Sequence, residues 1–343
     1  MTELLSAHTT FGLGGPARRW LAPTTEADLI SAVADADAAG EPVLILGGGS
    51  NVVVADEGFD GTVVHTGGLR GIHVDDVAAC SGAFLTVAAG EPWDAFVASR
   101  VAAQQAGIEA LSGIPGLVGA TPIQNVGAYG QEVAQVIARV RTWDRHAGEV
   151  HTFSAIECRF GYRDSLFKRE HGRWVVLSVS FQFRLGDLSG PIRYAELARS
   201  LGIDVGERAA LNDVREAVLA LRRGKGMVYD RGDHDSWSAG SFFTNPILRD
   251  ASLLPEGAPS YPQSDGRVKT SAAWLIEHAG FSRGYGQGPA RLSSRHTLAL
   301  TNRGEARTDD VVALARDIRD GVERAYGIRL VPEPVLVGVS LDD

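Results

Sequence analysis

A strand, a glycine turn and a second apolar run follow one another in Pro42-Val43-Leu44-Ile45-Leu46-Gly47-Gly48-Gly49-Ser50-Asn51-Val52-Val53-Val54. The dinucleotide fingerprint G-x-G-x-x-G would need a glycine at position 52 and a helix after the turn. Valine stands at that position and opens a β-branched run, which a helix disfavours. The sequence therefore argues against a Rossmann unit. Two interpretations of the turn stay open: a tight turn without a ligand, or a nest of backbone N–H groups around a pyrophosphate.

Three more segments are too rich in Gly, Asn and Pro for the interior of a helix or strand, yet they lack the charge of flexible linkers. They are Gly119–Gly130, Arg159–Ser165 and Ala239–Pro246. Such a loop is ordered only if its backbone N–H groups find partners, and a ligand with phosphates supplies them. One loop of this kind indicates an ordinary turn, whereas three in one chain favour a ligand site.

Length and composition describe an ordinary globular protein with room for more than one domain. The chain has 343 residues, whereas a single hydrophobic core stops growing near ~250–300 residues. Hydrophobic residues make up 44% and charged residues 22% of the chain. The net charge of −9 argues against nucleic acid or an anionic membrane as a partner. Contacts to phosphate must then come from backbone dipoles and a few chosen cations.

Cysteine and histidine usage gives no reason to expect a metal or a disulfide. The two cysteines, Cys80 and Cys158, form no C-x-x-C pair, and the nine histidines show no ligand spacing. Residues 1–10 contain Glu3 and no basic region before an apolar stretch, so we expect no signal peptide. No apolar run approaches the ~18 residues that span a bilayer. We therefore expect a cytoplasmic protein.

Hydrophobic periodicity and capping residues predict alternating helices and strands. Ser154-x-x-Glu157 has the spacing of a capping box and predicts a short helix that ends before Gly161. The other predicted helices cover residues 24–40, 93–106, 194–202, 212–223, 270–280 and 308–326. Predicted strands cover 42–46, 52–54, 61–66, 84–88, 136–144, 150–153, 174–183 and 297–300, with extended chain at 328–330 and 335–339.

Several of these segments together resemble the family of UDP-N-acetylenolpyruvoylglucosamine reductases. The resemblance runs in order from Thr10-Phe11-Gly12 to Pro332-Glu333. Between them it includes Leu44–Val52, Gly119–Gly130, Gly161–Ser165, Gly240–Pro246, Tyr261-Pro262-Gln263 and Gly266-x-Val268-Lys269. It implies an α+β fold: a two-lobed FAD-binding domain of the vanillyl-alcohol-oxidase (PCMH) type plus a C-terminal α+β substrate domain. The implied boundaries are 1–67 for lobe 1, 68–224 for lobe 2 and 225–343 for the substrate domain. A return of the last strand, near 330–340, to lobe 1 is left open.

The same resemblance implies an NADPH-dependent flavoenzyme of peptidoglycan synthesis. It would bind FAD non-covalently and reduce the enolpyruvyl group of UDP-N-acetylglucosamine enolpyruvate to the lactyl ether of UDP-N-acetylmuramate. Flavin N5 would supply the hydride. We expect a monomer without nucleic-acid or membrane partners. An FAD-dependent sugar or alcohol oxidase and a nucleotide-sugar sensor without activity are the alternatives. Neither Cys80 nor a histidine lies in the flavin loops, which counts against the covalent flavin of an oxidase.

Reduction of an enol ether conjugated to a carboxylate builds negative charge that fixed positive charge must face. Arg163 suits this, because a guanidinium is always charged and binds carboxylate with two hydrogen bonds. Its alternative is a surface ion pair, for example with Asp164. By the resemblance, Ser241 donates the proton and Glu333 is the acid that assists at the intermediate. Their alternatives are a turn hydroxyl and a solvated charge between two prolines. Many relatives carry a basic residue two positions after this glutamate, where this chain has Val335.

The binding residues are also carried over from the resemblance. Lys225 matches a lysine for the diphosphate of the substrate or the phosphate of NADPH. Tyr129, Tyr194 and Asn245 are expected to contact the nucleotide sugar, with Tyr194 in the substrate-covering loop of the longer subclass. Core packing is the rival interpretation of Tyr194. The expected cofactor-binding residues are Gly47, Gly48, Gly49, Ser50, Asn51, Gly116, Gly119, Thr121, Asn125, Gly127 and Arg222.

Overall fold

The computed structural model describes residues 3–342, which divide into two compact units. The first, here called the sheet unit, consists of Ala17–Gly48 and Asp60–Gly224. The second, here called the C-terminal unit, takes in the N-terminal segment up to Pro16, Gly49–Phe59 and the chain from Lys225 onward. The C-terminal unit is therefore built from three separate stretches of sequence.

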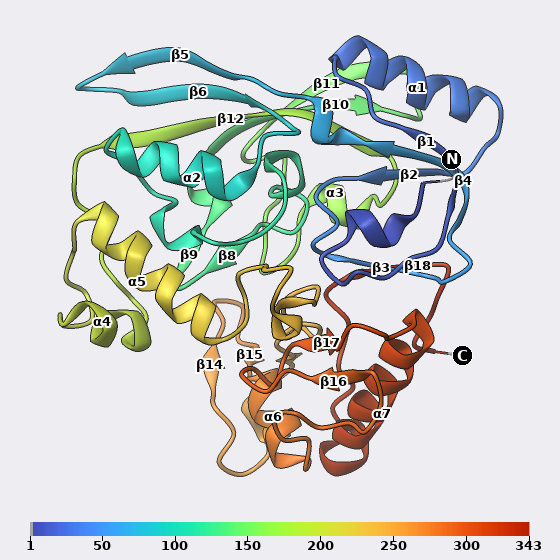
Figure 1. Ribbon diagram of the computed structural model, residues 1–343. Helices are drawn as coiled ribbons and strands as arrows, with labels where there is room; N and C mark the ends of the chain where they lie inside the picture. Colours follow the sequence, from blue (N-terminus) through green and yellow to red (C-terminus); the bar gives the residue numbers. More distant parts are fainter. Residues whose placement is uncertain (1–2, 343) are drawn as a thin grey trace. The chain divides into compact units, whose positions relative to one another are not determined.

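A six-stranded antiparallel sheet organises the sheet unit. Its order is β11 (Glu149–Ser154), β10 (Ile137–Asp144), β12 (Trp174–Leu185), β6 (Gly82–Ala88) and β5 (Ile72–Ala78), and β7 (Gln105–Ala106) pairs with the end of β12. Helix α2 (Trp93–Ala102) lies along β6 and β12 (Figure 1). Its buried Trp93 and Phe96 pack against Phe181 of β12, because alternate strand residues point to one face.

The opposite face of this sheet packs against α1 (Glu26–Ala38). Leu29 and Val33 of the helix meet Val175 and Leu177 of β12. A register irregularity between Val176 and Ser178 separates these residues from Phe181, which lies under α2. The predicted cap is confirmed, since the Thr25 side chain accepts a hydrogen bond from the Asp28 N–H at the start of α1. A smaller sheet beside α1 has the order β1 (Ala17–Leu21), β4 (Phe59–His65) and β2 (Val43–Leu46), with β2 and β4 parallel.

Two helices close the sheet unit. Helices α4 (Ala195–Leu201) and α5 (Leu211–Gly224) pack through Leu197, Val214 and Val218. The unit also contains α3 (Leu166–Arg169) and the short hairpin of β8 (Gly127–Ala128) and β9 (Gln131–Glu132). Short 3-10 helices across the chain lie at Leu5–His8, Thr66–Gly68, Glu109–Leu111, Val118–Ala120, Val133–Gln135, His234–Ser236 and Ala251–Leu253.

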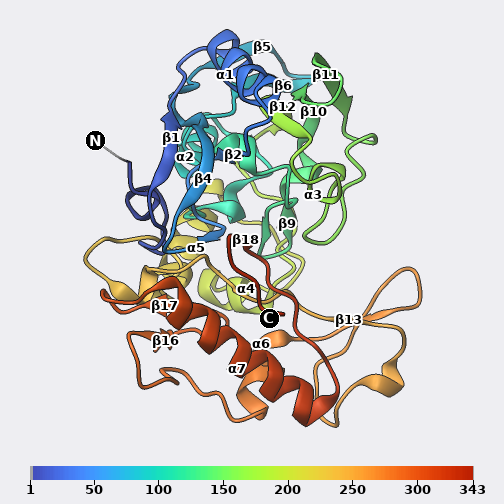
Figure 2. The same cartoon turned by 90° about the vertical axis from the view of Figure 1, so that its right-hand side faces the viewer.

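The C-terminal unit is built on α7 (Thr308–Tyr326), which lies along the hairpin of β16 (Ala290–Leu292) and β17 (Leu300–Asn302) (Figures 1 and 2). Helix α6 (Ala272–His278) joins the same core, together with the buried Phe242 and Phe243. A small sheet has the order β13 (Ile247–Leu248), β15 (Val268–Lys269), β14 (Tyr261–Pro262). The last strand, β18 (Val335–Val337), runs parallel to β3 (Val52–Val54).

Most predicted elements are confirmed, but two helices need correction. The predicted helix 93–106 ends at Ala102, because Gln104 has φ +54° and the next residues pair as β7. The predicted helix after Ser154 is wrong. The capping contact forms, with the Ser154 N–H 2.8 Å from Glu157 Oε2, yet Arg159 takes φ +48° and the chain makes turns. Strand 297–300 is displaced to Leu300–Asn302, and β1, β5 and β16 were not predicted.

Within residues 3–342 no helix combines the length and the apolar character that crossing a membrane requires.

Candidate active site

Arg163 lies in a tight turn that the backbone closes on itself. The Gly161 N–H donates to Asp164 O at 2.9 Å, and Arg163 takes the left-handed conformation with φ +51°. Its Nη2 donates to the carbonyl oxygen of Gly127 at 2.7 Å, and Lys168 Nζ donates to Arg163 O at 2.9 Å. Asp164, the ion-pair partner considered for Arg163, is 2.6 Å from Arg169. The turn thus directs the guanidinium to the β8–β9 hairpin.

Asn125 ties this turn to the glycine-rich loop. Its Nδ2 donates to Gly161 O and to Glu132 Oε2, both at 2.9 Å, and its Oδ1 accepts from the Ala134 N–H at 3.1 Å. The residue is only 1% exposed and has φ +46°. Both amide hydrogens are therefore committed to the protein. Through its side chain, Asn125 therefore holds the hairpin and the Arg163 turn together.

Backbones approach closely where the glycines lie. A Cβ at Gly48 would be 2.7 Å from the Cα of Gly116, so the turn after β2 touches the backbone just before the Gly119–Gly130 loop. A Cβ at Gly119 would be 2.5 Å from the Cβ of Ala89. The nearby Thr121 is buried, and its hydroxyl donates to Val118 O at 2.8 Å. Two peptide backbones in contact without side chains form the kind of cradle that a pyrophosphate needs.

The Gly119–Gly130 loop also contains Gln124, whose side-chain oxygen has no hydrogen-bond donor in the described structure. Gln124 Oε1 is buried and accepts no hydrogen bond from the described residues. A buried amide oxygen without a donor is costly, which marks it for a ligand group that donates. Gln124 was not among the predicted binding residues, although it lies inside the quoted loop. With the glycine cradle, it makes the residues present compatible with a bound flavin dinucleotide.

Arg222, Tyr129 and Tyr194 lie near one another in the sheet unit. Arg222 lies in the last turn of α5 and is 8% exposed. Burial lowers the pKa of its guanidinium to about 10, although Tyr129 and Asp94 favour its charge. Burial raises the pKa of the Tyr129 phenol, which the charge of Arg222 partly offsets. The rings of Tyr129 and Tyr194 meet edge to face at 6.1 Å. Tyr194 is 53% exposed, so core packing does not describe it.

Ser241 and Glu333 are brought together in the C-terminal unit. The segment after Ser241 runs antiparallel to the segment before Glu333: the Glu333 N–H donates to Phe242 O at 2.8 Å, and the Thr244 N–H donates to Val331 O at 3.0 Å. Phe242 is 1% exposed and anchors this pairing in the core. Both Ser241 and Glu333 are half-buried. Ser241 and Glu333 thus lie on neighbouring segments whose backbones are paired.

Asn51, in the turn that includes Gly49 and Ser50, contacts the Glu333 segment. Asn51 Nδ2 donates to Glu333 O at 3.3 Å, and the Val335 N–H donates to Asn51 O at 3.0 Å. A Cβ at Gly49 would lie 1.9 Å from His8 O, so only glycine fits there. Val335 is the first residue of β18.

Asn245 and Lys225 are the other predicted binding residues of the C-terminal unit. Asn245 Oδ1 accepts the Ala272 N–H at 2.9 Å and thereby caps the first turn of α6, so part of its side chain serves the fold. Lys225 is half-buried and precedes Gly226, which has φ +66°. No group of three or more His, Cys, Asp or Glu side chains suited to a metal occurs in the described part of the chain.

The chain matches two family models. Residues 17–154 match a model described as an FAD binding domain. Residues 232–337 match one described as the C-terminal domain of UDP-N-acetylenolpyruvoylglucosamine reductase. The two matches fall in the parts of the chain where the flavin-binding and substrate-binding segments were predicted.

Curated proteins named UDP-N-acetylenolpyruvoylglucosamine reductase are similar to this chain over nearly its whole length. The protein from Cutibacterium acnes is 57% identical over 342 residues, covering 98% of this chain and 90% of that protein. The protein from Thermobifida fusca is 55% identical over 351 residues, covering 98% and 97%. The crystal structure of the Thermus caldophilus reductase superimposes with a TM-score of 0.65 at 24% identity, covering 98% of each chain. The predicted α+β fold, with an FAD-binding domain followed by a C-terminal domain, is confirmed.

Proposed function

Because this chain belongs to the family of UDP-N-acetylenolpyruvoylglucosamine reductases, we propose that Arg163, Ser241 and Glu333 act on the enolpyruvyl group of its substrate. The chain is an FAD-dependent oxidoreductase that reduces UDP-N-acetylglucosamine enolpyruvate to UDP-N-acetylmuramate, with NADPH as reductant. FAD, when bound, supplies the hydride that adds to one carbon of the enolpyruvyl double bond. The neighbouring carbon must then receive a proton from the protein.

Arg163 stabilises the negative charge that builds on the substrate carboxylate. Its support is the turn Gly161–Asp164, which fixes the residue at φ +51°, and the 2.7 Å hydrogen bond to Gly127 O, which fixes the guanidinium. A preorganised cation needs no rearrangement when the charge develops, and this is how such groups lower a barrier. The planar fork suits a carboxylate better than an ammonium group does.

Ser241 donates the proton to carbon, and Glu333 assists. The observation that carries this proposal is the backbone pairing of Phe242 with Glu333, which sets the two functional side chains on adjacent segments. A serine hydroxyl is a weak acid, so it requires a neighbour that stabilises or replaces the proton it gives up. Glu333, half-buried on the segment that pairs with the one after Ser241, is our candidate for that role.

The glycine turns hold the cofactor, and the polar residues around them hold the substrate. The close contact of Gly48 with Gly116 and the open Gln124 Oε1 support the placement of FAD at these loops. Tyr129 and the exposed Tyr194 are the residues for the nucleotide sugar, and Lys225 is the cation for a diphosphate. For Asn245 the proposal is restricted to its Nδ2, because Oδ1 caps α6. The comparisons give no support to the oxidase or the sensor.

Cytoplasmic location, a monomeric state and the absence of nucleic-acid and membrane partners complete the proposal. The net charge of −9 supports the absence of nucleic-acid and anionic-membrane partners. Gel filtration with light scattering would test the monomer.

Absorbance of the purified protein tests the proposed reaction. The protein should be yellow, lose its flavin band when NADPH is added without oxygen, and regain it when UDP-N-acetylglucosamine enolpyruvate follows. A reduced protein that stays bleached with this substrate, but regains colour in air, would point to the oxidase instead.

A further inference from the structure

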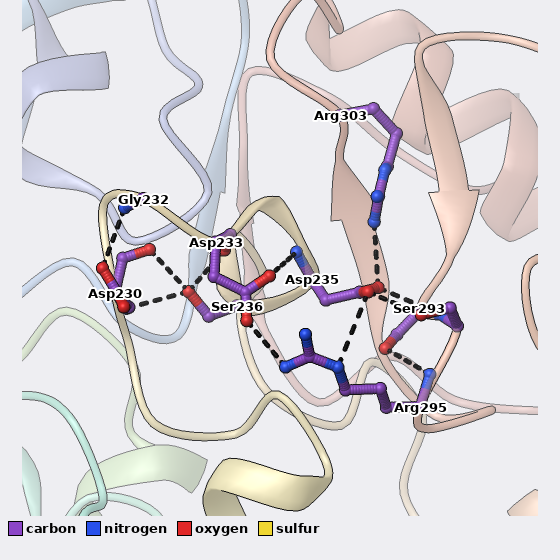
Figure 3. A network of polar contacts seen from close by, with 9 residues as sticks. Asp230, Gly232, Asp233, Asp235, Ser236, Ser293, Arg295 and Arg303 are labelled. Carbon is purple, nitrogen blue, oxygen red and sulfur yellow. Dashed lines mark hydrogen bonds and ion pairs between the residues drawn. The ribbon is translucent and has the colours of Figure 1, made fainter.

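Asp235 is the centre of a buried polar network in the C-terminal unit (Figure 3). The residue is 5% exposed and lies in the 3-10 helix His234–Ser236. Its Oδ1 accepts the Ser294 N–H and Arg303 Nη1, both at 2.9 Å, and its Oδ2 accepts the Ser294 hydroxyl at 2.6 Å. Arg295 Nε lies 3.9 Å from the same carboxylate. The carboxylate therefore fastens the 3-10 helix to the turn between β16 and β17.

The surroundings keep this carboxylate charged. Burial raises the pKa of Asp235, but the hydrogen bonds from Ser294 and the charge of Arg303 outweigh it and leave the pKa below its ordinary value. A buried carboxylate with this many donors is held in one position, because any movement breaks several charge-assisted bonds. The network is therefore a rigid point in a segment that otherwise has little regular structure.

On its N-terminal side the network meets the segment that begins at Lys225. Gly226 has φ +66°, and a Cβ there would lie 2.8 Å from the carbonyl oxygen of Asp235. The backbone of Gly226 is thus in direct contact with the backbone that the Asp235 carboxylate anchors. The position of Lys225, one residue earlier, depends on this contact.

On its C-terminal side the network leads to Ser241 through a chain of fixed backbone groups. The Asn302 N–H donates to Trp237 O at 3.0 Å, and the Thr10 hydroxyl donates to Ser238 O at 2.6 Å. The Gly240 N–H donates to Ser238 Oγ at 3.2 Å. Five residues lie between Asp235 and Ser241, and these hydrogen bonds restrict the movement of their backbone.

We infer that Asp235 is a positioning residue for proton donation by Ser241 and for the cation Lys225. This rests on the proposed roles of these two residues. Asp235 touches no reacting atom in this scheme; it acts by fixing the backbone on either side of itself. Proton transfer to carbon is sensitive to small displacements, so loss of the network reduces the step that uses Ser241 more than steps that do not.

The test is Asp235→Asn, measured in the two half-reactions by anaerobic stopped-flow absorbance of the FAD-loaded protein. Asparagine keeps the shape but loses the charge that faces Arg303 and one acceptor. The limiting rate of flavin reoxidation by UDP-N-acetylglucosamine enolpyruvate should fall about 10- to 100-fold, the cost of a small misplacement. The limiting rate of flavin reduction by NADPH should stay near the wild-type rate. The substrate concentration for half-maximal reoxidation should rise, because a displaced Lys225 would bind the substrate diphosphate less well.

Asp233→Asn is the matched control. Asp233 lies two residues earlier in the same segment, is half-buried and contacts Arg295 at 2.6 Å. Its Oδ1 accepts the Asp235 N–H, which an asparagine oxygen also does. Both limiting rates of this variant should match the wild type. Ser294→Ala, which removes only the hydroxyl bond to Asp235, should slow reoxidation selectively and by less than Asp235→Asn.

Two outcomes overturn the inference: equal slowing of both half-reactions in Asp235→Asn, or no change in either. If Asp235→Asn yields no folded, FAD-containing protein, Ser294→Ala decides by the same criterion, and an unselective effect rejects the role of Asp235. If the wild-type protein itself does not pass electrons to the enolpyruvyl substrate, the proposed function fails, and the inference with it.

Discussion

The guanidinium of Arg163 donates a 2.7 Å hydrogen bond to the carbonyl oxygen of Gly127, 36 residues earlier in the chain. A Cβ at Gly127 would lie 3.2 Å from Arg163 Nη1, so the glycine leaves space for the guanidinium. The site cation and the glycine-rich loop are therefore placed by one contact. Neither segment could move without disturbing the other.

Arg163→Lys should slow reoxidation of the flavin by substrate about 100- to 1000-fold, the usual cost of removing one preorganised charge donor. Lysine keeps the charge but lacks the planar fork that reaches Gly127 O and a carboxylate together. Reduction by NADPH should change little. Stopped-flow absorbance measures both rates. Arg169→Lys, at a half-exposed partner of Asp164 in the same region, is the control and should behave as wild type. A comparable loss in the control would show that the region is merely fragile.

Gly48→Ala should reduce the amount of FAD that remains bound after purification. The added methyl would lie 2.7 Å from the Cα of Gly116, so one of the two backbones must shift and the cradle opens. The ratio of flavin to protein absorbance measures the loss, and thermal unfolding with and without added FAD measures its consequence for stability. Gly288→Ala is the control, since no atom lies within 4 Å of a Cβ at that position. Full FAD content in Gly48→Ala would place the cofactor away from this turn.

Elements with local signals at both ends were predicted well from the sequence. Helix α7 was expected over 308–326 and occupies Thr308–Tyr326, because Asp310 accepts the Arg307 N–H at one end and Gly327 takes a left-handed conformation at the other. The C-terminal limit of α2 was missed because it depends on β12, a distant partner that recruits Gln105 and Ala106. Local propensity does not contain such a partner.

The candidate site, too, could be predicted only in part from the sequence. Its loops were recognisable from composition, but their mutual contacts join residues far apart in sequence. Glu333 meets Phe242 from 91 positions away, and Asp235 finds Ser294 from 59 positions away. In the sequence Asp235 is one acid in a polar loop, with nothing to distinguish it from Asp233. Asp235 differs from Asp233 through its burial and its hydrogen bonds from Ser294 and Arg303, and these exist only in the folded chain.

Stability at low pH should depend on Asp144. This carboxylate is 3% exposed and accepts from Arg173 Nη2 at 2.7 Å and from the His146 N–H at 2.9 Å. The hydrogen bond from Arg173, followed by the two backbone donors, outweighs burial and lowers the pKa of Asp144 to about 2. A lowered pKa stabilises the fold above the unfolded-state pKa near 3.8 and loses that effect as the pH falls towards 2.

Asp144→Asn should therefore lower the free energy of unfolding of the sheet unit by about 2 kcal/mol at neutral pH, and by progressively less between pH 4 and pH 2. Chemical denaturation followed by fluorescence at several pH values gives both numbers. Asp265→Asn, at an exposed carboxylate paired with Arg267, should give little difference at any pH. A loss in Asp144→Asn that is the same at every pH would mean that packing, not charge, is responsible.

Ser241→Ala separates proton donation from every other step. The hydroxyl is lost, while the backbone that binds Leu298 and Glu333 through Phe242 is retained, so the fold and FAD content should be unchanged. Reduction by NADPH should proceed at nearly the wild-type rate, and reoxidation by substrate should fall about 100- to 10,000-fold, the range of general acid contributions. Single-turnover absorbance measures both. Ser252→Ala, at an exposed serine in the 3-10 helix Ala251–Leu253, controls for loss of a surface hydroxyl. If both half-reactions of Ser241→Ala slow together, the serine supports the fold and another group delivers the proton.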